Sequence, residues 1–513
     1  MFSLISCSAM AGVAEWVCCP GELNAPLYRA LTNCPVVHRW SVADDRAAAF
    51  FALGRVQATG HPVIVVAGSG SSAAAMTPAV INAYYQRRPL VVLTMDTLDG
   101  CGGTGAPQRV EQEALFGMYA PTVELNLPCP VSDLPNLTEA LSEGFPLHLH
   151  VRLDEQAEPP CCDFSSIDVA EPPAPPRFRG SLVAVSQMLR FHAMEGLVLI
   201  IGALNPDEQE PVLWLAQTLR VPVLAEASSG LREELAPYLL HGGDDLLRQS
   251  PPRYVLRVGD VPTGAFWKAL DNLPQTEVYS LTRTGFSGLS RKSYVTEGEL
   301  EQIMKALGDV PHVGDTERLL PRSRHMAARL EELLLGYPES AESLILAFSR
   351  FACLGDVICL GSATTARLWN RFAQYQVPTL YLRDLHTTGS DGALSTFLGN
   401  AADAATAYCL LGDLTLLRDI NGAALLPQLP PGKRVVAVLN NDGAAAALSA
   451  AASAPEMERL LVQPQPFRMQ EIARLWGAEY HAVYCEADLE ILDTLEDNAF
   501  VLLELIPEGP MSC

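Results

Sequence analysis

The chain has 513 residues, more than a single hydrophobic core normally organises, so about three domains are expected. Hydrophobic residues make up 49% and charged residues 18% of the sequence, a balance typical of a well-packed globular protein. The formal net charge of −24 argues against a nucleic-acid partner, and no apolar run approaches the roughly 20 residues of a membrane span.

Charge and cysteine usage also bear on the substrate and the compartment. An anionic substrate would need a local cationic pocket that acts against the negative field of the whole molecule. The 13 cysteines lack zinc-type spacing, and no basic residue precedes the mildly apolar start. We therefore expect reduced thiols in a cytoplasmic protein without a signal peptide.

Short apolar runs rich in β-branched residues alternate with helical segments along the chain. The runs lie at residues 61–70, 88–96, 196–204, 253–260, 356–363, 407–413 and 433–442. Their apolar residues are continuous rather than alternating, which indicates strands covered on both faces, as in parallel sheets with crossover helices. The sequence thus predicts an α/β fold with several doubly wound, mainly parallel sheets.

Two polar, turn-rich stretches predict the domain boundaries. Residues 168–180, DVAEPPAPPRFRG, have the proline-rich composition of an interdomain linker, and a second break lies near 309–325. The predicted domains cover residues 1–170, 181–315 and 325–513. Three α/β units in one acidic chain favour an enzyme whose site lies at the carboxyl ends of strands.

A charged corner precedes an apolar helical run in VADDRAAAFFALG, residues 42–54. Aspartate is a preferred N-cap and acids suit the first turn of a helix. Capping accounts for one of the two adjacent acids, Asp44 and Asp45, but it does not account for both.

The strongest local signal is the segment LLGDLTLLRDINGAALLPQLPPGKRVVAVLNNDG, residues 410–443. Carboxyl ends of parallel strands meet at one edge of a sheet, so Asp413 and Asn441 can face one ion although they are 28 positions apart. Carboxylate, amide and carbonyl oxygens suit Mg²⁺, which completes its coordination shell with phosphate oxygens. Gly412 permits close backbone approach, and the helix that follows favours an anion at its N-terminus. The alternative is a generic strand–turn–helix with a capping aspartate.

The pattern of Gly-Asp, 27 residues and then Asn is that of thiamine-diphosphate enzymes. The segment GDLTLLRDINGAALL resembles one family of these enzymes in particular, the 2-succinyl-5-enolpyruvyl-6-hydroxy-3-cyclohexene-1-carboxylate synthases of menaquinone biosynthesis. Further stretches resemble that family in the same order along the chain, at residues 18–31, 44–54, 68–83, 101–117 and 389–399. The resemblance implies pyrimidine-binding, central and diphosphate-binding domains. It also implies a homodimer or homotetramer with active sites between subunits, and thiamine diphosphate with Mg²⁺ as cofactors for small-molecule substrates.

The resemblance further implies roles for individual residues. Asp45 falls on the family's catalytic glutamate, which exchanges a proton with the aminopyrimidine ring of the cofactor. Arg367 falls on an arginine that binds a substrate carboxylate, with an ordinary surface arginine as the alternative. The implied positions are Asp45 and Gln108 for catalysis; Thr387, Thr388, Gly389, Asp391 and Gly412 for the cofactor; Asp413, Asn441 and the Gly443 carbonyl for Mg²⁺; and Arg367 for substrate.

Several positions depart from the family pattern. Asp45 is one methylene shorter than the glutamate, so its carboxyl group lies about 1.3 Å closer to the backbone. A misplacement of about 1 Å can lower a catalytic rate on the order of 10²-fold. Ser390 stands where the family has a bulky apolar residue that bends the cofactor, and His386 is a new titratable group. Substrate arginines of the family align with Leu23, Thr97, Ala265–Phe266 and Leu385.

Three functional hypotheses follow from the family resemblance and the departures from it. The first is the family reaction, decarboxylation of 2-oxoglutarate and addition of the succinyl unit to isochorismate. The second is a related decarboxylase or carboligase for less anionic 2-oxo acids, with Leu23, Phe266 and Leu385 lining a more apolar pocket. The third is a degenerate, non-catalytic paralogue that binds the cofactor or only oligomerises.

Overall fold

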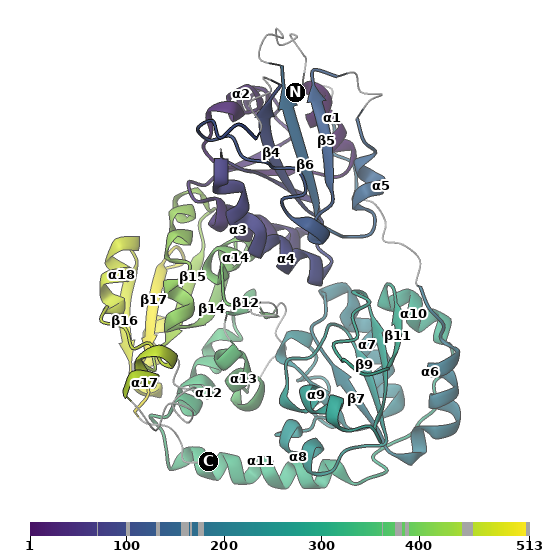
Figure 1. Ribbon diagram of the computed structural model, residues 1–513. Helices are drawn as coiled ribbons and strands as arrows, with labels where there is room; N and C mark the ends of the chain where they lie inside the picture. The colour runs from purple at the N-terminus through teal and green to yellow at the C-terminus, as the bar shows by residue number, and fades with distance from the viewer. Residues whose placement is uncertain are drawn as a thin grey trace. The chain divides into compact units, whose positions relative to one another are not determined.

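The structure is a computed structural model (Figure 1). Its chain divides into two compact units. Unit 1 comprises Met1–Pro176, Thr388–Asp403 and Arg418–Pro430, and unit 2 comprises Arg177–Thr387, Ala404–Leu417 and Pro431–Cys513. The described residues are 1–68, 70–98, 103–129, 134–154, 164, 167–172, 179–361, 363–374, 382–384, 389–443 and 455–508. None of the helices within these ranges is long and apolar enough to cross a membrane.

Unit 1 contains a six-stranded parallel sheet with the strand order β2-β1-β3-β4-β6-β5. Its strands are β1 (Glu15–Cys18), β2 (His38–Ser41), β3 (Val63–Val66), β4 (Leu90–Thr97), β5 (Thr122–Leu127) and β6 (Leu147–Leu153). Its helices are α1 (Phe2–Met10), α2 (Ala25–Thr32), α3 (Asp45–Thr59), α4 (Thr77–Gln86), α5 (Leu137–Leu141) and α14 (Ala393–Asn400). The four residues of β3 are fully buried, as expected for a central strand covered on both faces.

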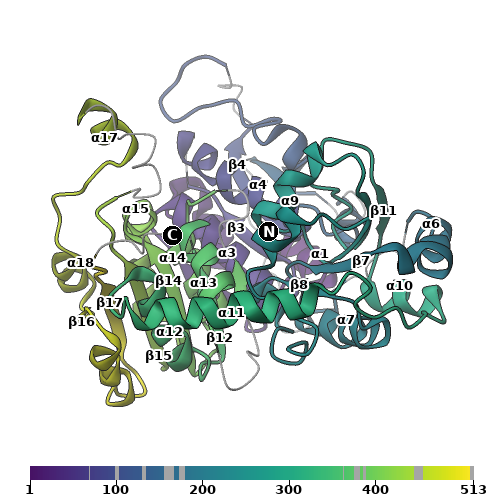
Figure 2. The same cartoon turned by 90° about the horizontal axis from the view of Figure 1, so that it is seen from below.

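Unit 2 contains two further parallel sheets. The first has the order β11-β10-β9-β7-β8. Its strands are β7 (Leu197–Ile201), β8 (Val223–Ala225), β9 (Tyr254–Val258), β10 (Glu277–Thr282) and β11 (Tyr294–Glu297). It is accompanied by α6 (Val183–Gln187), α7 (Pro206–Leu219), α8 (Gly243–Gln249), α9 (Ala265–Ala269) and α10 (Leu300–Leu307). The long helix α11 (Leu319–Leu335) then leads toward the next sheet (Figure 2).

The last sheet has the order β13-β12-β14-β15-β17-β16. Its strands are β12 (Val357–Leu360), β13 (Leu382–Asp384), β14 (Thr406–Gly412), β15 (Lys433–Leu439), β16 (Glu479–Val483) and β17 (Phe500–Leu505). Its helices are α12 (Ala341–Ala352), α13 (Ala363–Phe372), α15 (Asp413–Leu417), α17 (Pro455–Leu461) and α18 (Met469–Trp476). The predicted α/β class with mainly parallel sheets is therefore confirmed.

Unit 1 is held together by a close crossing of α3 and α14. A Cβ on Gly54 would lie 2.3 Å from the carbonyl oxygen of Thr396, and a Cβ on Gly399 would lie 2.3 Å from that of Phe51. Only glycine allows the two backbones to approach this closely. The crossing thus ties the N-terminal sheet to a segment more than 300 residues later in the chain.

Candidate active site

The two adjacent acids at the start of α3 have different partners. Asp44 is the N-cap, and its carboxylate accepts a hydrogen bond from the Ala47 backbone N–H at 2.8 Å. Its other oxygen accepts from the Asn421 side-chain amide at 2.8 Å. Asp45 is the first helical residue, and its carboxylate accepts from the Gly68 backbone N–H at 2.6 Å. Capping therefore explains Asp44 and leaves the Asp45 carboxylate for another role.

The Asp45 carboxyl is half-buried at the carboxyl ends of β1 and β3. Burial raises the pKa of Asp45, and the charge of Asp44 raises it further, whereas hydrogen bonds from Gly68, the Ser72 hydroxyl and the Cys19 thiol lower it. The net shift is upward, so this carboxyl holds a proton more readily than an ordinary aspartate does. It can therefore act as a proton donor or acceptor closer to neutral pH.

The turns beside Asp45 are fixed by hydrogen bonds from one side chain to the backbone. The Asn24 side-chain amide donates to the Ala67 carbonyl at 2.8 Å and to the Cys19 carbonyl at 3.3 Å, so it bridges the ends of neighbouring strands. A Cβ on Gly68 would lie 2.8 Å from the Ser72 hydroxyl oxygen. Sequence reasoning missed Cys19, Gly68 and Ser72, although all three follow strand ends, where α/β sheets place their sites.

Gln108 lies on the loop that approaches the same turn. Its Cα would be 3.4 Å from a Cβ on Gly70, and Gly70 begins the 3₁₀ turn Gly70–Met76 that contains Ser72. Gln108 is exposed and has a left-handed φ of 62°. The next residue, Arg109, forms an ion pair with Asp96 at 2.7 Å, which anchors the loop to the end of β4. Asp45 and Gln108 therefore both lie next to the stretch that contains Gly68, Gly70 and Ser72.

A second polar site lies in unit 2, where β14 and β15 end. These strands are neighbours, and Gly412 pairs with Leu439. The Asp413 carboxylate accepts from the Gly443 N–H at 2.6 Å and from the Leu414 N–H at 2.7 Å. Burial raises the pKa of Asp413, and these backbone donors oppose that shift. The structure thus brings Asp413 to the loop that carries Asn441 and Gly443, at one edge of the sheet.

The Asp413 site has the chemistry of a cation site. Asp413 is only 3% exposed, and no cationic side chain within the described ranges pairs with it. The Asn441 side chain likewise forms no hydrogen bond among these residues. Gly443 presents its N–H to Asp413, and its carbonyl remains a predicted ligand. No cluster of three His, Cys, Asp or Glu side chains occurs in the described part of the chain, so amide, backbone, water or phosphate oxygens would have to complete a cation's shell.

The remaining predicted cofactor positions lie before α14. A Cβ on Gly389 would lie 3.8 Å from the Asp391 carboxylate, which shows that these two residues are neighbours in unit 1. Ser390 is half-buried beside them. Four residues singled out from the sequence lie outside the described residues, namely Leu385, His386, Thr387 and Thr388.

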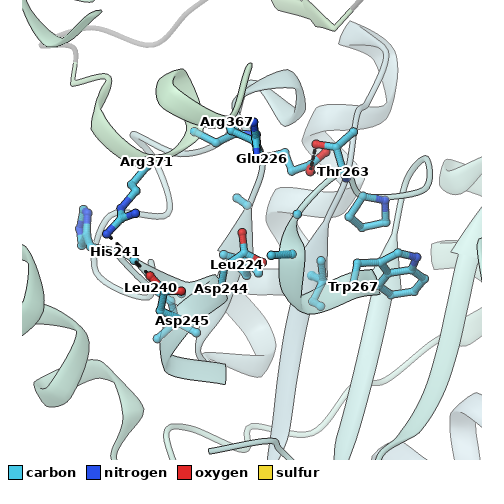
Figure 3. Close-up of a pocket in the computed structure, with 18 of the residues that line it drawn as sticks. Leu224, Glu226, Leu240, His241, Asp244, Asp245, Thr263, Trp267, Arg367 and Arg371 are labelled. Carbon is cyan, nitrogen blue, oxygen red and sulfur yellow. Dashed lines mark hydrogen bonds and ion pairs between the residues drawn. The ribbon is translucent and has the colours of Figure 1, made fainter. Parts of the chain in front are cut away.

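Arg367 lines a cavity of about 190 Å³ in unit 2 (Figure 3). The cavity lies between the carboxyl ends of the β7–β11 sheet and helix α13. The Arg367 Nε donates to the Ala363 carbonyl at 3.2 Å, one turn back on the same helix. Phe266, which the second hypothesis placed on a pocket wall, is 0% exposed and packs in the core beneath the sheet. That expectation was wrong, because the neighbouring Ala265 faces the cavity instead.

Comparison with known proteins decides the family. Residues 3–115 match the model "Thiamine pyrophosphate enzyme, N-terminal TPP binding domain". The 2-succinyl-5-enolpyruvyl-6-hydroxy-3-cyclohexene-1-carboxylate synthase of Akkermansia muciniphila is 46% identical over 99% of this chain and 95% of its own length. The chain belongs to this synthase family. The synthase of Bdellovibrio bacteriovorus is 30% identical over 84% of the chain and 82% of its own length.

A solved structure agrees with the fold of this synthase-family chain. A putative thiamin diphosphate-dependent enzyme from Mycobacterium smegmatis superposes with a TM-score of 0.72, covers 99% of both chains and is 16% identical in sequence. At this identity the match supports the fold alone. Family membership establishes a thiamine-diphosphate type of enzyme, as the sequence motifs predicted.

Proposed function

We propose that the protein is a thiamine-diphosphate-dependent decarboxylating carboligase of menaquinone biosynthesis. It would join the succinyl unit of 2-oxoglutarate to isochorismate. The observation that carries the proposal is the 46% identity to a synthase of that name over 99% of the chain. The proposal includes three domains at 1–170, 181–315 and 325–513, a cytoplasmic location, and a homodimer or homotetramer with sites between subunits.

Asp45 is the proposed proton-transfer group. When bound, thiamine diphosphate supplies the electron sink for the pair released as CO₂ leaves a 2-oxo acid. The Gly68 N–H holds the Asp45 carboxylate at 2.6 Å, and Ser72 and Cys19 restrict it further. A carboxyl that is both fixed and shifted upward in pKa can hold a proton and release it at a defined position. Gln108 is proposed to face the reacting centre from the loop beyond the Gly70–Met76 turn.

Asp413, Asn441 and Gly443 are the proposed Mg²⁺ ligands. A divalent cation would offset the burial cost of the Asp413 carboxylate, for which the described residues provide no counter-charge. Such an ion would draw diphosphate oxygens toward Gly412 and the start of α15. Gly389 and Asp391 are proposed as further contacts of the cofactor.

The first test measures cofactor binding apart from turnover. Purified protein is heated with and without Mg²⁺ and millimolar thiamine diphosphate, and a rise in Tm is expected because the ligands bind only the folded chain. Asp413→Asn should remove the rise, whereas the exposed neighbour change Asp442→Asn should preserve it. Absence of any rise for the natural chain would contradict both enzymatic hypotheses and leave the non-catalytic paralogue.

The second test identifies the substrate. CO₂ release is followed with 2-oxoglutarate and with pyruvate, and the adduct with isochorismate is sought by mass spectrometry. Release from 2-oxoglutarate together with the adduct is expected. Release from pyruvate alone would replace the proposed reaction by the second hypothesis, a carboligase or decarboxylase for less anionic acids.

A further inference from the structure

Glu504 is an acid on an otherwise apolar strand. Strand β17 reads FVLLEL, and Glu504 is only 7% exposed in it. A buried charge is costly unless it is paired or hydrogen-bonded. The two side chains that donate to the Glu504 carboxylate are both neutral, the Asn440 amide and the Tyr480 hydroxyl. Packing of the strand alone therefore does not account for an acid at this position.

The register of the sheet places these three side chains on one face. Glu504 pairs with Val438 of β15 and with Ala482 of β16. Asn440 lies two residues after Val438. Tyr480 lies two residues before Ala482. Side chains alternate between the two faces along a strand, so the three polar groups lie on the same face and form a diagonal across it. The diagonal ends where β15 gives way to the loop that carries the proposed cation ligands.

The contact with Glu504 fixes the direction of the Asn440 amide. A carboxylate can only accept, so the amide nitrogen of Asn440 faces Glu504, at 2.6 Å, and its carbonyl oxygen faces the other way. That oxygen accepts from the Asp442 N–H at 3.1 Å, which closes a turn around Asn441. The Asn440 N–H donates to the Leu505 carbonyl at 2.9 Å, so the base of the turn is also anchored to β17.

The turn has a backbone that needs such support. Asp442 and Gly443 have positive φ angles of 57° and 101°, and this conformation is unfavourable for a residue with a side chain. A Cβ on Gly443 would lie 2.2 Å from the Val462 carbonyl oxygen, so the chain passes its neighbour closely here. The Gly443 N–H donates to the Asp413 carboxylate at 2.6 Å. One chain of contacts thus connects Glu504 with the Asp413 site.

We propose that Glu504 is a positioning residue for the divalent cation. Through Asn440, it holds the turn that carries Asn441 and Gly443. The inference rests on the proposed function, in which these two residues are Mg²⁺ ligands. Mg²⁺ demands near-ideal octahedral geometry, whereas Ca²⁺ accepts irregular coordination shells. A loosened turn therefore weakens the binding of Mg²⁺ more than that of Ca²⁺.

The test compares two replacements of Glu504. Glu504→Leu is similar in size but has no acceptor, so it removes the partner of the Asn440 amide. Glu504→Gln keeps a carbonyl oxygen for Asn440, and its own amide can donate to the Tyr480 hydroxyl oxygen, so it preserves the contact without the charge. The full chain is heated with millimolar thiamine diphosphate, and the Mg²⁺ concentration that gives half of the full rise in Tm is determined. The series is repeated with Ca²⁺.

The expected results differ between the two ions. Glu504→Leu should raise the half-effective Mg²⁺ concentration by about tenfold or more, because a hydrogen bond to a charged group is lost. The Ca²⁺ value should rise by less than about threefold. Glu504→Gln should stay within about threefold of the natural chain for both ions. Glu479→Leu is the control, because it removes an exposed acid from the neighbouring strand β16, and it should leave both values unchanged.

A second variant guards against poor folding of Glu504→Leu. Asn440→Ala removes the same contact from the side of the loop, and it should weaken Mg²⁺ binding more than Ca²⁺ binding as well. Both changes act through one hydrogen bond, so the double variant should bind Mg²⁺ little more weakly than Asn440→Ala alone. Circular dichroism and the Tm without ligands show whether each variant is folded.

The outcomes separate this inference from the proposed function. Absence of any Mg²⁺-dependent rise in Tm for the natural chain would refute both. A normal rise that Glu504→Leu leaves unchanged, or an equal loss for Mg²⁺ and Ca²⁺, would overturn the positioning role and leave the proposed reaction standing. The same holds if Glu504→Gln is as weak as Glu504→Leu, or if the losses in the double variant simply add, because Glu504 would then act by charge or without Asn440.

Discussion

At the scale of single residues, Asp45 combines a fixed position with a shortened side chain. Its carboxylate is held against the Gly68 N–H at 2.6 Å. The resemblance places a glutamate at this position, which would extend the acid beyond that contact. The shorter side chain keeps the acid about one bond length nearer to its own backbone than a glutamate would.

Lengthening this side chain is the first prediction. We expect Asp45→Glu to raise turnover by about tenfold or more, because a change of about 1 Å in the position of the acid can govern proton transfer. Asp45→Asn should abolish turnover, because it removes the acid. Initial rates of CO₂ release at saturating cofactor provide the measurement. Asp44→Glu serves as the control, since it alters the cap and should lower stability without raising turnover. An unchanged rate in Asp45→Glu would count against a catalytic role.

A second residue-scale prediction concerns Asp419, which is fully buried and accepts hydrogen bonds from the Ser395 N–H at 2.6 Å and hydroxyl at 2.9 Å. Burial raises the pKa of Asp419 to about 6 from an ordinary 3.8. The folded state then binds the proton more tightly than the unfolded state. Its stabilising effect is complete below pH 3.8 and is lost as the pH rises to about 6.

Asp419→Asn removes this titration. The free energy of unfolding of the natural chain should fall by about 2 kcal/mol relative to Asp419→Asn between pH 4 and pH 6.5, with little further divergence above that window. Urea unfolding at a series of pH values measures the difference. Parallel pH profiles for the two proteins would show that Asp419 titrates normally.

At the scale of elements, the α3–α14 crossing depends on paired glycines. Gly399→Ala would place a Cβ 2.3 Å from the Phe51 carbonyl oxygen, so the helices must separate. We expect a loss of about 1–3 kcal/mol, the usual cost of overpacking, measured by thermal or urea unfolding. Gly336→Ala is the control, since its nearest contact would be 3.4 Å. Equal stability of the two variants would refute the close crossing.

Much of the fold could be predicted because its central strands are continuously apolar. The runs at 61–70 and 433–442 contain β3 and β15, whose buried residues fit the expected pattern. Strand β6 was missed because its sequence alternates leucine with histidine. His148 and His150 are nonetheless buried, and both hydrogen-bond the Thr94 hydroxyl, at 2.9 and 3.1 Å. Polar pairs between strands cannot be recognised from a hydropathy pattern.

The candidate site was predictable only in part. The Asp413–Gly443 contact follows from two strand ends at one sheet edge, a rule of parallel topology. The thiol of Cys19 beside Asp45 depends on how the ends of β1 and β3 pack against the start of α3. Only the three-dimensional structure brings these two side chains together.

At the scale of the whole molecule, the net charge of −24 opposes the approach of anionic substrates. Raising the ionic strength from about 20 to 150 mM should screen that field. We expect kcat/KM for the dianion 2-oxoglutarate to rise by about two- to fivefold, and for pyruvate by less. Steady-state kinetics in KCl measure both values. A fall in kcat/KM over this range would show that local cationic groups dominate the encounter.

Unit 1 is built from three separate segments of the chain, and this affects how it folds during synthesis on the ribosome. Helix α3 ends at Thr59, but its partner α14 is complete only at Asn400. At a ribosomal speed of about 5–20 residues per second, the glycine face of α3 stays uncovered for roughly 15 to 70 s. The nascent N-terminal sheet therefore waits for a segment that is synthesised after the whole β7–β11 sheet, and a fragment ending at Pro176 would never receive it.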